Sequence, residues 1–281
     1  MSASIAFYKM SGSGNDFILV DNRTTIIQPE LASDVARSLC QRKVSVGADG
    51  LILIESDPEV DFSWRFLNAD GSSAEMCGNG GRCAARLANM LGICGTHLSF
   101  RTLAGIIGAE VAGTRVKLQM TPPGDLRLEE KLEFGDHSVV AHFVNTGVPH
   151  TVFIVDNIEN LEKQDVVGQG REVRYHQHYA PAGTNVNFVA VLGYRSVSLR
   201  TYERGVEDET LACGTGATAA ALVAAAKGFV EPPVDVRTKS GEILTIHFNS
   251  SEQLPNELYM EGETKIVYQG QLSEEAINIT I

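Results

Sequence analysis

The chain of 281 residues carries a formal net charge of −12, with 43% hydrophobic and 21% charged residues. This composition suffices for a packed core and excludes an intrinsically disordered protein, and the length allows one large domain or two smaller ones. An acidic chain lacks the basic face that nucleic acid requires, so no nucleic-acid partner is expected. The longest apolar run, Ala217 to Ala226, is too short to cross a bilayer, and the first residues do not form a secretory signal. We therefore expect a cytoplasmic protein without membrane association, whose five cysteines are free thiols.

Short runs rich in β-branched and aromatic residues recur along the chain and predict strands. They are Phe17–Val20, Leu51–Ile54, Val116–Met120, Thr151–Asp156, Val186–Leu192, Ser196–Tyr202 and Ile243–Phe248. Helices are fewer, and one is expected at Leu31–Arg42. Two more follow Cys77 and Cys213 and end at Gly92 and Gly228, because glycine commonly terminates helices.

The chain repeats itself at an offset of 135 or 136 residues. The segment MCGNGGRCAARLANMLG from Met76 matches ACGTGATAAALVAAAKG from Ala212 at an offset of 136. ILVDN from Ile18 matches FIVDN, Arg65 matches Arg200, and RTLAG from Arg101 matches RTKSG, at offsets of 135, 135 and 136. Matches in the same order at nearly one offset indicate an internal duplication.

The duplication predicts an α+β protein of two pseudo-symmetric domains. The first domain is expected at residues 1–121 with Cys77, and the second at 138–263 with Cys213. The tail, residues 264–281, should add one or two strands that close a sheet. Since the helix after Cys213 is apolar on every face, protein must surround it, so each half is expected to be a curved, mostly antiparallel sheet wrapped around a central helix.

Cys77 and Cys213 are the candidate catalytic residues, because each precedes the central helix of its half. Two related halves pack most simply about a pseudo-two-fold axis, so the two thiols could face each other across the domain interface. A helix N-terminus lowers a thiol pKa and binds anions, and glycines next to each cysteine leave the backbone accessible to a carboxylate. Two thiols on opposite sides of one carbon suit a racemase or epimerase, in which one removes the α-proton and the other protonates the opposite face.

Other chemistries fit the sequence less well. The chain has no phosphate-binding loop and no Cys-x-x-Cys pair for zinc, and no lysine stands in a context typical of a pyridoxal-phosphate enzyme. The segment His176 to His178 is expected to be a polar loop, with metal binding as the alternative. Neither a cofactor nor a metal is therefore expected. Cys40, Cys83 and Cys94 lack the duplicated context and are interpreted as structural.

Five longer segments closely resemble the diaminopimelate epimerase family. They are KMSGSGNDFILVD from Lys9, GADG from Gly47, FLNADGSSAEMCGNGGRC from Phe66, GTNVNF from Gly183 and YERGVEDETLACGTGA from Tyr202. The resemblance implies the diaminopimelate epimerase-like fold, a homodimer, and cofactor-independent interconversion of LL- and meso-2,6-diaminopimelate in lysine and peptidoglycan precursor synthesis. It also implies that Cys77 and Cys213 are the two acid–base thiols.

The same resemblance implies the residues around the substrate. His150 and Glu203 are expected to support the reacting centre. The residues expected to bind substrate are Asn15, Asn68, Gly78, Asn79, Asn185, Glu203, Arg204, Gly214 and Thr215. Arg204 suits a carboxylate and Glu203 an ammonium group, which fits the distal amino-acid end of the substrate. Val148 stands where the family usually has asparagine, so the hydrogen bonds of that side chain are lost or replaced.

Two rival functions remain open from the sequence alone. An enzyme of the same fold could act on another amino acid, such as histidine or proline, although the Glu203–Arg204 pair favours a substrate with a distal end. A non-catalytic amino-acid-binding module is the second alternative. The presence of both cysteines, each beside a helix start, argues against it.

Overall fold

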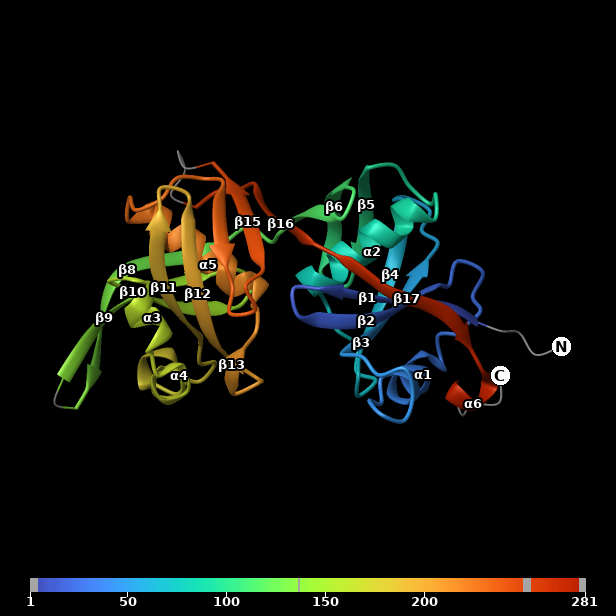
Figure 1. Cartoon of the computed structure of the whole chain (residues 1–281), viewed down its shortest axis with the longest axis horizontal. Coiled ribbons are helices and arrows are strands. Elements are labelled where there is room, and N and C mark those ends of the chain that lie inside the picture. Colours follow the sequence, from blue (N-terminus) through green and yellow to red (C-terminus); the bar gives the residue numbers. More distant parts are fainter. Residues whose placement is uncertain (1–4, 136, 250–253, 278–281) are drawn as a thin grey trace. The chain divides into compact units, whose positions relative to one another are not determined.

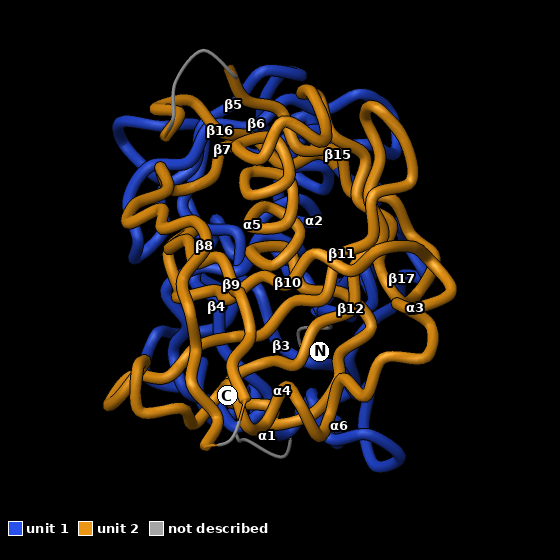
Figure 2. Tube along the Cα trace, turned by 90° about the vertical axis from the view of Figure 1, so that its left-hand side faces the viewer, with its two compact units in different colours: residues 1–118, 262–281 blue, residues 119–261 orange. Residues whose placement is uncertain are grey.

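The computed structural model describes residues 5–135, 137–249 and 254–277. The chain divides into two compact units, unit 1 with residues 1–118 and 262–281 and unit 2 with residues 119–261, which Figure 2 shows in different colours. The chain leaves unit 1 within strand β7 (Arg115–Gln119) and returns to it within β16 (Leu258–Glu263). Figure 1 labels elements of both units where there is room.

Unit 1 is a curved sheet with one helix on its inner face. Its other strands are β1 (Ile5–Gly12), β2 (Asn15–Asp21), β3 (Gly50–Glu55), β4 (Phe62–Asn68), β5 (His97–Thr102), β6 (Gly105–Ala112) and β17 (Lys265–Leu272), and its helices are α1 (Ala32–Leu39), α2 (Gly78–Met90) and α6 (Glu274–Ile277). The strands pair in the order β17–β1–β2–β3–β4–β5–β6–β7. The β2–β3 and β4–β5 pairs are parallel, and the others are antiparallel.

Unit 2 repeats this arrangement. Its other strands are β8 (Gly124–Phe134), β9 (His137–Asn145), β10 (Pro149–Val155), β11 (Asn185–Gly193), β12 (Ser196–Glu203), β13 (Asp208–Thr210), β14 (Val234–Arg237) and β15 (Ile243–Phe248), and its helices are α3 (Ile158–Glu162), α4 (Val166–Arg174), the 3₁₀ turn η1 (Gln177–Tyr179) and α5 (Gly214–Ala226). The strands pair in the order β8–β9–β10–β11–β12–β14–β15–β16. The parallel pairs are again the third and the fifth, β10–β11 and β12–β14.

The central helix of each unit is buried against the sheet. In unit 1, Ala84, Leu87 and Ala88 of α2 pack in one cluster with aromatic side chains from β2 and β4. In unit 2, every residue of α5 from Gly216 to Ala224 is buried, as an all-apolar helix requires. Alanine dominates α5, so the surrounding strands approach its backbone closely.

Helices on the outer faces explain why some strands are apolar throughout. In β2, Phe17 and Leu19 belong to the cluster around α2, whereas Ile18 and Val20 belong to the cluster that contains α1. The β10 and β11 strands of unit 2 are covered likewise, by α5 on one face and by α3 and α4 on the other. Such strands are uniform in hydrophobicity because both faces are buried.

Both central helices end in the same backbone motif. Gly92 and Gly228 have φ angles of +69° and +74°, in the left-handed region. The following residue donates to the carbonyl five positions back, from Ile93 to Ala88 and from Phe229 to Ala224, at 3.0 and 2.9 Å. These are Schellman motifs, for which glycine is the preferred residue.

The α+β class and the sheet wrapped around a helix are therefore confirmed. Each expected strand overlaps an observed one, and α1 is shorter than the helix expected at Leu31–Arg42. The sequence analysis did not anticipate helices α3 and α4 or strand β8. Strand β8 begins directly after the Pro122–Pro123 pair. In the tail, β17 pairs with β1, and residues 278–281 lie outside the described residues. None of the helices in the described part of the chain is long and apolar enough to cross a membrane.

The tight packing of α5 gives a stability prediction. We expect Ala220→Leu to destabilise the protein by about 1–3 kcal/mol, because Ala220 is fully buried and the larger side chain overfills the core. Ala226→Leu, at the exposed end of the same helix, is the matched control and should change stability by less than about 0.5 kcal/mol. Urea unfolding of both variants measures the difference. Equal midpoints would contradict the close packing.

Candidate active site

Cys77 caps the first turn of α2 in unit 1. Its backbone is extended, and its Sγ accepts a hydrogen bond from the Gly80 amide at 3.5 Å. The thiol therefore takes the place of the hydroxyl or carboxylate oxygen that usually caps a helix. Cys77 is partly exposed, whereas Cys40 and Cys83 are buried.

Asparagines surround this helix start. Asn79 donates through Nδ2 to Oδ1 of Asn15 at 2.8 Å, and Asn15 donates to Oδ2 of Asp49 at 2.9 Å. The Oδ1 of Asn79 accepts from the fully buried Arg82 at 2.9 Å. Segments that begin at Lys9, Gly47 and Met76 in the sequence thus meet in one polar network beside Cys77.

A cluster of ion pairs adjoins this network through Asp49, which accepts from Asn15 and pairs with Arg42. Lys9 is buried, pairs with Asp16 at 2.7 Å and also donates to the Gly47 carbonyl. Arg42 pairs with both Asp16 and Asp49. Burial acts to raise the pKa of Asp16, but hydrogen bonds from Arg42 and Lys9 outweigh it, so its pKa is lowered and the carboxylate stays ionised.

Asn68 lies at the end of β4, opposite Gly50 on β3. Its Nδ2 donates to the Ser72 hydroxyl at 3.0 Å, and its backbone amide donates to the Ser72 carbonyl at 2.8 Å. The side chain therefore stabilises its own turn, as asparagine often does.

Cys213 caps α5 in unit 2 as Cys77 caps α2. Its Sγ accepts from the Gly216 amide at 3.4 Å and lies 3.5 Å from the Thr215 hydroxyl. Thr146 fixes this helix start from outside by donating to the Thr215 carbonyl at 3.1 Å. Unlike Cys77, Cys213 is buried, with 6% of its surface exposed.

Burial raises the pKa of Cys213 to about 12, and the negative charge of Glu203 acts in the same direction. Hydrogen bonds from Thr215 and the Gly216 amide oppose this shift but do not outweigh it. The expectation that a helix start lowers the thiol pKa is therefore wrong for Cys213, since desolvation of the thiolate costs more than the helix amides return. Burial likewise raises the pKa of Glu203.

Hydrogen bonds join Asn185, the first residue of β11, to Arg204, which directly follows β12. The Asn185 side chain donates to the Pro149 carbonyl at 2.9 Å and accepts from the Arg204 amide at 2.8 Å. The Arg204 guanidinium donates to the Ala182 carbonyl at 3.0 Å. His150 stands opposite Asn185 in the β10–β11 pair and is fully buried. Unit 2 thus holds His150, Asn185 and Arg204 in one cluster, and Glu203 acts on Cys213.

Asn187 is a residue that the sequence analysis missed. Its Nδ2 donates to His150 Nδ1 and to the Thr151 carbonyl, both at 3.0 Å. A side chain at Gly216 would begin 2.6 Å from Asn187 Oδ1, so the absence of a side chain at this glycine makes room for Asn187. The sequence could have indicated Asn187, because Asn185 and Asn187 are two residues apart on one strand and their side chains point to the same face.

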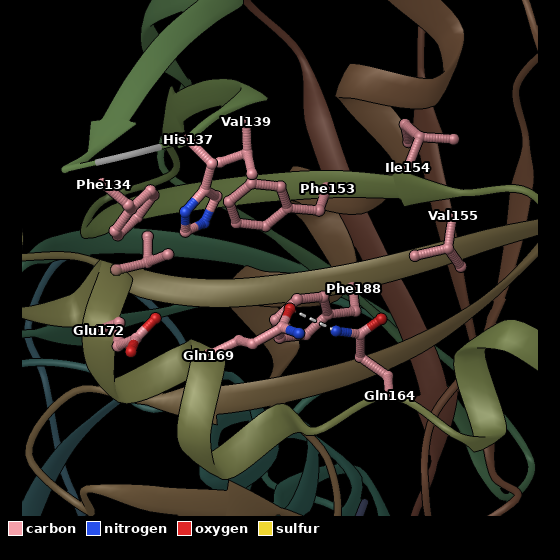
Figure 3. A pocket seen from close by; sticks show the side chains of 11 residues that line it. Phe134, His137, Val139, Phe153, Ile154, Val155, Gln164, Gln169, Glu172 and Phe188 are labelled. Atoms are coloured by element: carbon pink, nitrogen blue, oxygen red, sulfur yellow. Dashed lines mark hydrogen bonds between the residues drawn. The ribbon is translucent and has the colours of Figure 1, made fainter.

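A separate pocket of about 320 Å³ opens on unit 2 away from these residues. Figure 3 shows the rings of Phe134, Phe153 and Phe188 along it, with the Gln164–Gln169 hydrogen bond at one side. Neither Cys213 nor His150 lines it. Among the described residues, no group of three or more histidine, cysteine or acidic side chains is arranged to hold a metal ion.

Comparison with solved structures defines the class of fold. The chain matches a PhzF-family phenazine biosynthesis protein from Bacillus anthracis with a TM-score of 0.70 and 14% identity, over 97% of this chain and 100% of that one. It matches a probable proline racemase from Agrobacterium radiobacter K84 with a TM-score of 0.66 and 13% identity, over 99% and 96%. The protein thus shares its fold with these proteins.

Sequence comparison identifies the family within that class. The diaminopimelate epimerase family model matches residues 7–124 and 142–267. The diaminopimelate epimerase of Aquifex aeolicus is 50% identical over 96% of this chain and 99% of its own length. The chain belongs to the diaminopimelate epimerase family, whose members are isomerases.

The unequal burial of the two cysteines predicts unequal reactivity. We expect iodoacetamide to label Cys77 before Cys213 near neutral pH, because the thiolate reacts and burial raises the pKa of Cys213 to about 12. Cys94 is partly exposed but should also react slowly, since burial raises its pKa to about 11. Peptide mass mapping over a time course gives the order. Labelling of Cys213 first would contradict it.

The charge of Glu203 predicts the effect of removing it. Glu203→Gln should lower the pKa of Cys213, because the neutral amide no longer disfavours the thiolate. At a pH high enough to ionise the wild-type carboxylate, Cys213 should therefore be alkylated faster in the variant. Glu231→Gln is a control that removes one negative charge elsewhere in unit 2. An unchanged rate for Glu203→Gln would place the Glu203 carboxylate too far from the thiol to act.

Proposed function

We propose that this protein interconverts LL- and meso-2,6-diaminopimelate without a cofactor, in lysine and peptidoglycan precursor synthesis. The observation that carries the proposal is the matched pair of helix starts, each capped by its own cysteine thiol. Membership of the family and 50% identity to the Aquifex aeolicus enzyme support the substrate.

The reaction breaks the α-carbon–hydrogen bond and forms it again on the opposite face. One cysteine acts as the thiolate that takes the proton, and the other donates its thiol proton to the carbanion. Because burial and Glu203 both disfavour a thiolate at Cys213, Cys213 is the thiol at rest and Cys77 the thiolate in one direction. After turnover Cys77 holds the abstracted proton and Cys213 is the thiolate, which is the state that catalyses the reverse direction. Proton exchange with solvent restores the first state for another forward turnover.

Amide and charged groups recognise the substrate in this proposal. The free N–H groups of the first helical turns, at Gly78–Asn79 and Gly214–Thr215, bind the carboxylate at the reacting centre and stabilise the carbanion. Arg204 and Glu203 bind the carboxylate and the ammonium group of substrate ends. The asparagines that complete the set are Asn15, Asn68 and Asn185. His150 and Glu203 support the reacting centre.

A cytoplasmic location and a homodimer complete the proposal. Reactive thiols persist in a reducing compartment, which supports the cytoplasm. Val267 and Tyr268 are exposed apolar side chains on β17, and such a surface favours a partner strand from a second copy. The net charge of −12 disfavours nucleic acid.

A racemase of histidine or proline with the same fold is the rival function. The Arg204 guanidinium has exposed surface, and the Asn185 hydrogen bond holds its backbone in place. A substrate with a single amino-acid end has only one carboxylate, and the helix N–H groups at the reacting centre bind it in this proposal, so Arg204 would have no anionic partner. The longer, doubly zwitterionic substrate is therefore favoured.

Proton exchange in D₂O tests the activity directly. With LL-diaminopimelate and no added cofactor, NMR should show loss of the α-proton signal and formation of the meso isomer. Uptake of deuterium from histidine or proline instead would keep the two-thiol reaction and replace the substrate. No exchange from any of the three would refute the epimerase.

Cysteine variants test the two-thiol reaction. Cys77→Ser and Cys213→Ser should each reduce turnover by about 10²- to 10⁴-fold, because a serine hydroxyl is a far weaker acid than a thiol. Circular dichroism should show that both variants fold. Cys94→Ser is the matched control, since Cys94 does not cap a central helix, and it should keep the wild-type rate. Near-wild-type rates in either helix-start variant would refute the mechanism.

A further inference from the structure

The imidazole of His150 is fully buried, and within the part of the chain that the structure describes its ring makes one hydrogen bond. Nδ1 lies 3.0 Å from Nδ2 of Asn187. Within the described residues, Nε2 is buried and has no hydrogen-bond partner. A buried polar atom without a partner is rare in folded proteins and commonly marks a place where a ligand supplies the partner.

The contacts of Asn187 decide which ring nitrogen carries the proton. The Thr151 carbonyl can only accept, so the group 3.0 Å from it must be the Asn187 NH₂. The Thr201 hydroxyl donates to the amide oxygen of Asn187 at 3.0 Å, which agrees with this orientation. The second N–H of the same NH₂ therefore points at His150 Nδ1, which must accept. In neutral imidazole the proton then resides on Nε2.

The imidazole stays neutral over the working pH range. Burial lowers the pKa of His150 to about 3, and the positive charge of Arg204 acts in the same direction. A neutral ring with its proton on Nε2 is a hydrogen-bond donor there and offers no lone pair for a general base.

Asn187 also connects this ring to the start of α5. The point where a Gly216 side chain would begin lies 2.6 Å from Asn187 Oδ1 and 3.2 Å from Cys213 Sγ. His150, Asn187 and the cysteine that caps the helix are therefore parts of one packed cluster in unit 2. The Arg204 charge acts on His150 in this cluster, so an anion is the ligand favoured near the ring.

We propose that Asn187 is a positioning residue that fixes His150 as a neutral donor, so that Nε2–H binds a carboxylate oxygen of the amino-acid substrate. This assignment rests on the proposed function for the identity of the substrate. The tautomer of His150 does not depend on it. His150 consequently binds the substrate and does not remove a proton from either thiol.

Nitrogen NMR of histidine-labelled protein tests the tautomer without any activity measurement. The spectrum of wild-type protein should show His150 as the neutral Nε2–H form from about pH 8 down to about pH 5, with His150→Gln assigning its signals. An Nδ1–H form or an imidazolium in this range would overturn the proposal. If the tautomer is as expected but LL-diaminopimelate is not turned over, the activity fails while the role of Asn187 in fixing the ring stands.

Asn187→Asp tests the consequence for binding. A carboxylate accepts from Nδ1–H, so His150 should present a lone pair at Nε2 when neutral and regain the Nε2 proton only as imidazolium. We expect KM to rise about 10- to 100-fold near pH 8 with a smaller change in kcat, and to recover as the pH falls and the ring is protonated. If Asn187 had a purely structural role, the variant would change kcat and KM together, and neither change would depend on pH in this way.

Asn157→Asp is the matched control for Asn187→Asp. Asn157 caps α3, where aspartate caps equally well, so the same change of chemistry should leave KM and its pH profile unchanged. Thermal unfolding shows whether the Asn187→Asp protein folds. If it does not fold, the proposal is tested by the tautomer of His150 in the nitrogen NMR spectrum of wild-type protein. A KM profile of folded Asn187→Asp that coincides with that of the control would overturn the proposal.

Discussion

Burial of one helix inside each sheet is the constraint on which the rest of the structure depends. An apolar helix such as α5 is stable only when protein surrounds it, and its first turn then lies among buried groups. The amide groups of that turn still need acceptors, and a cysteine thiol provides one in each unit. In unit 2 the requirement that buries the helix thus also buries the Cys213 thiol, whereas Cys77 in unit 1 is partly exposed. Desolvation, more than the helix dipole, then sets the pKa of Cys213.

The two units share one order of strand pairing but differ in chemistry beside the helix start. At the repeat offset, Asn15 corresponds to His150 and Asn79 to Thr215. Asn15 bonds directly to the helix residue Asn79, whereas His150 bonds to Asn187 on the neighbouring strand. The same backbone therefore supports two different hydrogen-bonding sets.

Much of this architecture could be predicted from the sequence, because glycine positions and apolar runs determine local geometry. Gly92 and Gly228 predicted the helix ends, where their φ angles are positive. The pKa of Cys213 was not predictable, since its burial is a property of packing across distant strands. The role of Asn187 depends on contacts with Thr151 and Thr201, far apart in the chain. Strand β8 was hidden because its sequence is charged and half-exposed, without an apolar run.

The last strand, β17, belongs to the sheet of unit 1 although it follows unit 2 in the sequence. Strand β17 pairs with β1 at the same position in the order of unit 1 that β8 occupies beside β9 in unit 2. In unit 2 this strand comes immediately before its neighbour, whereas in unit 1 it comes from the other end of the chain. Unit 1 therefore cannot complete its sheet until the C-terminal segment has been made. The order of pairing supports a duplicated origin, and the position of β17 explains why the first copy needs the tail.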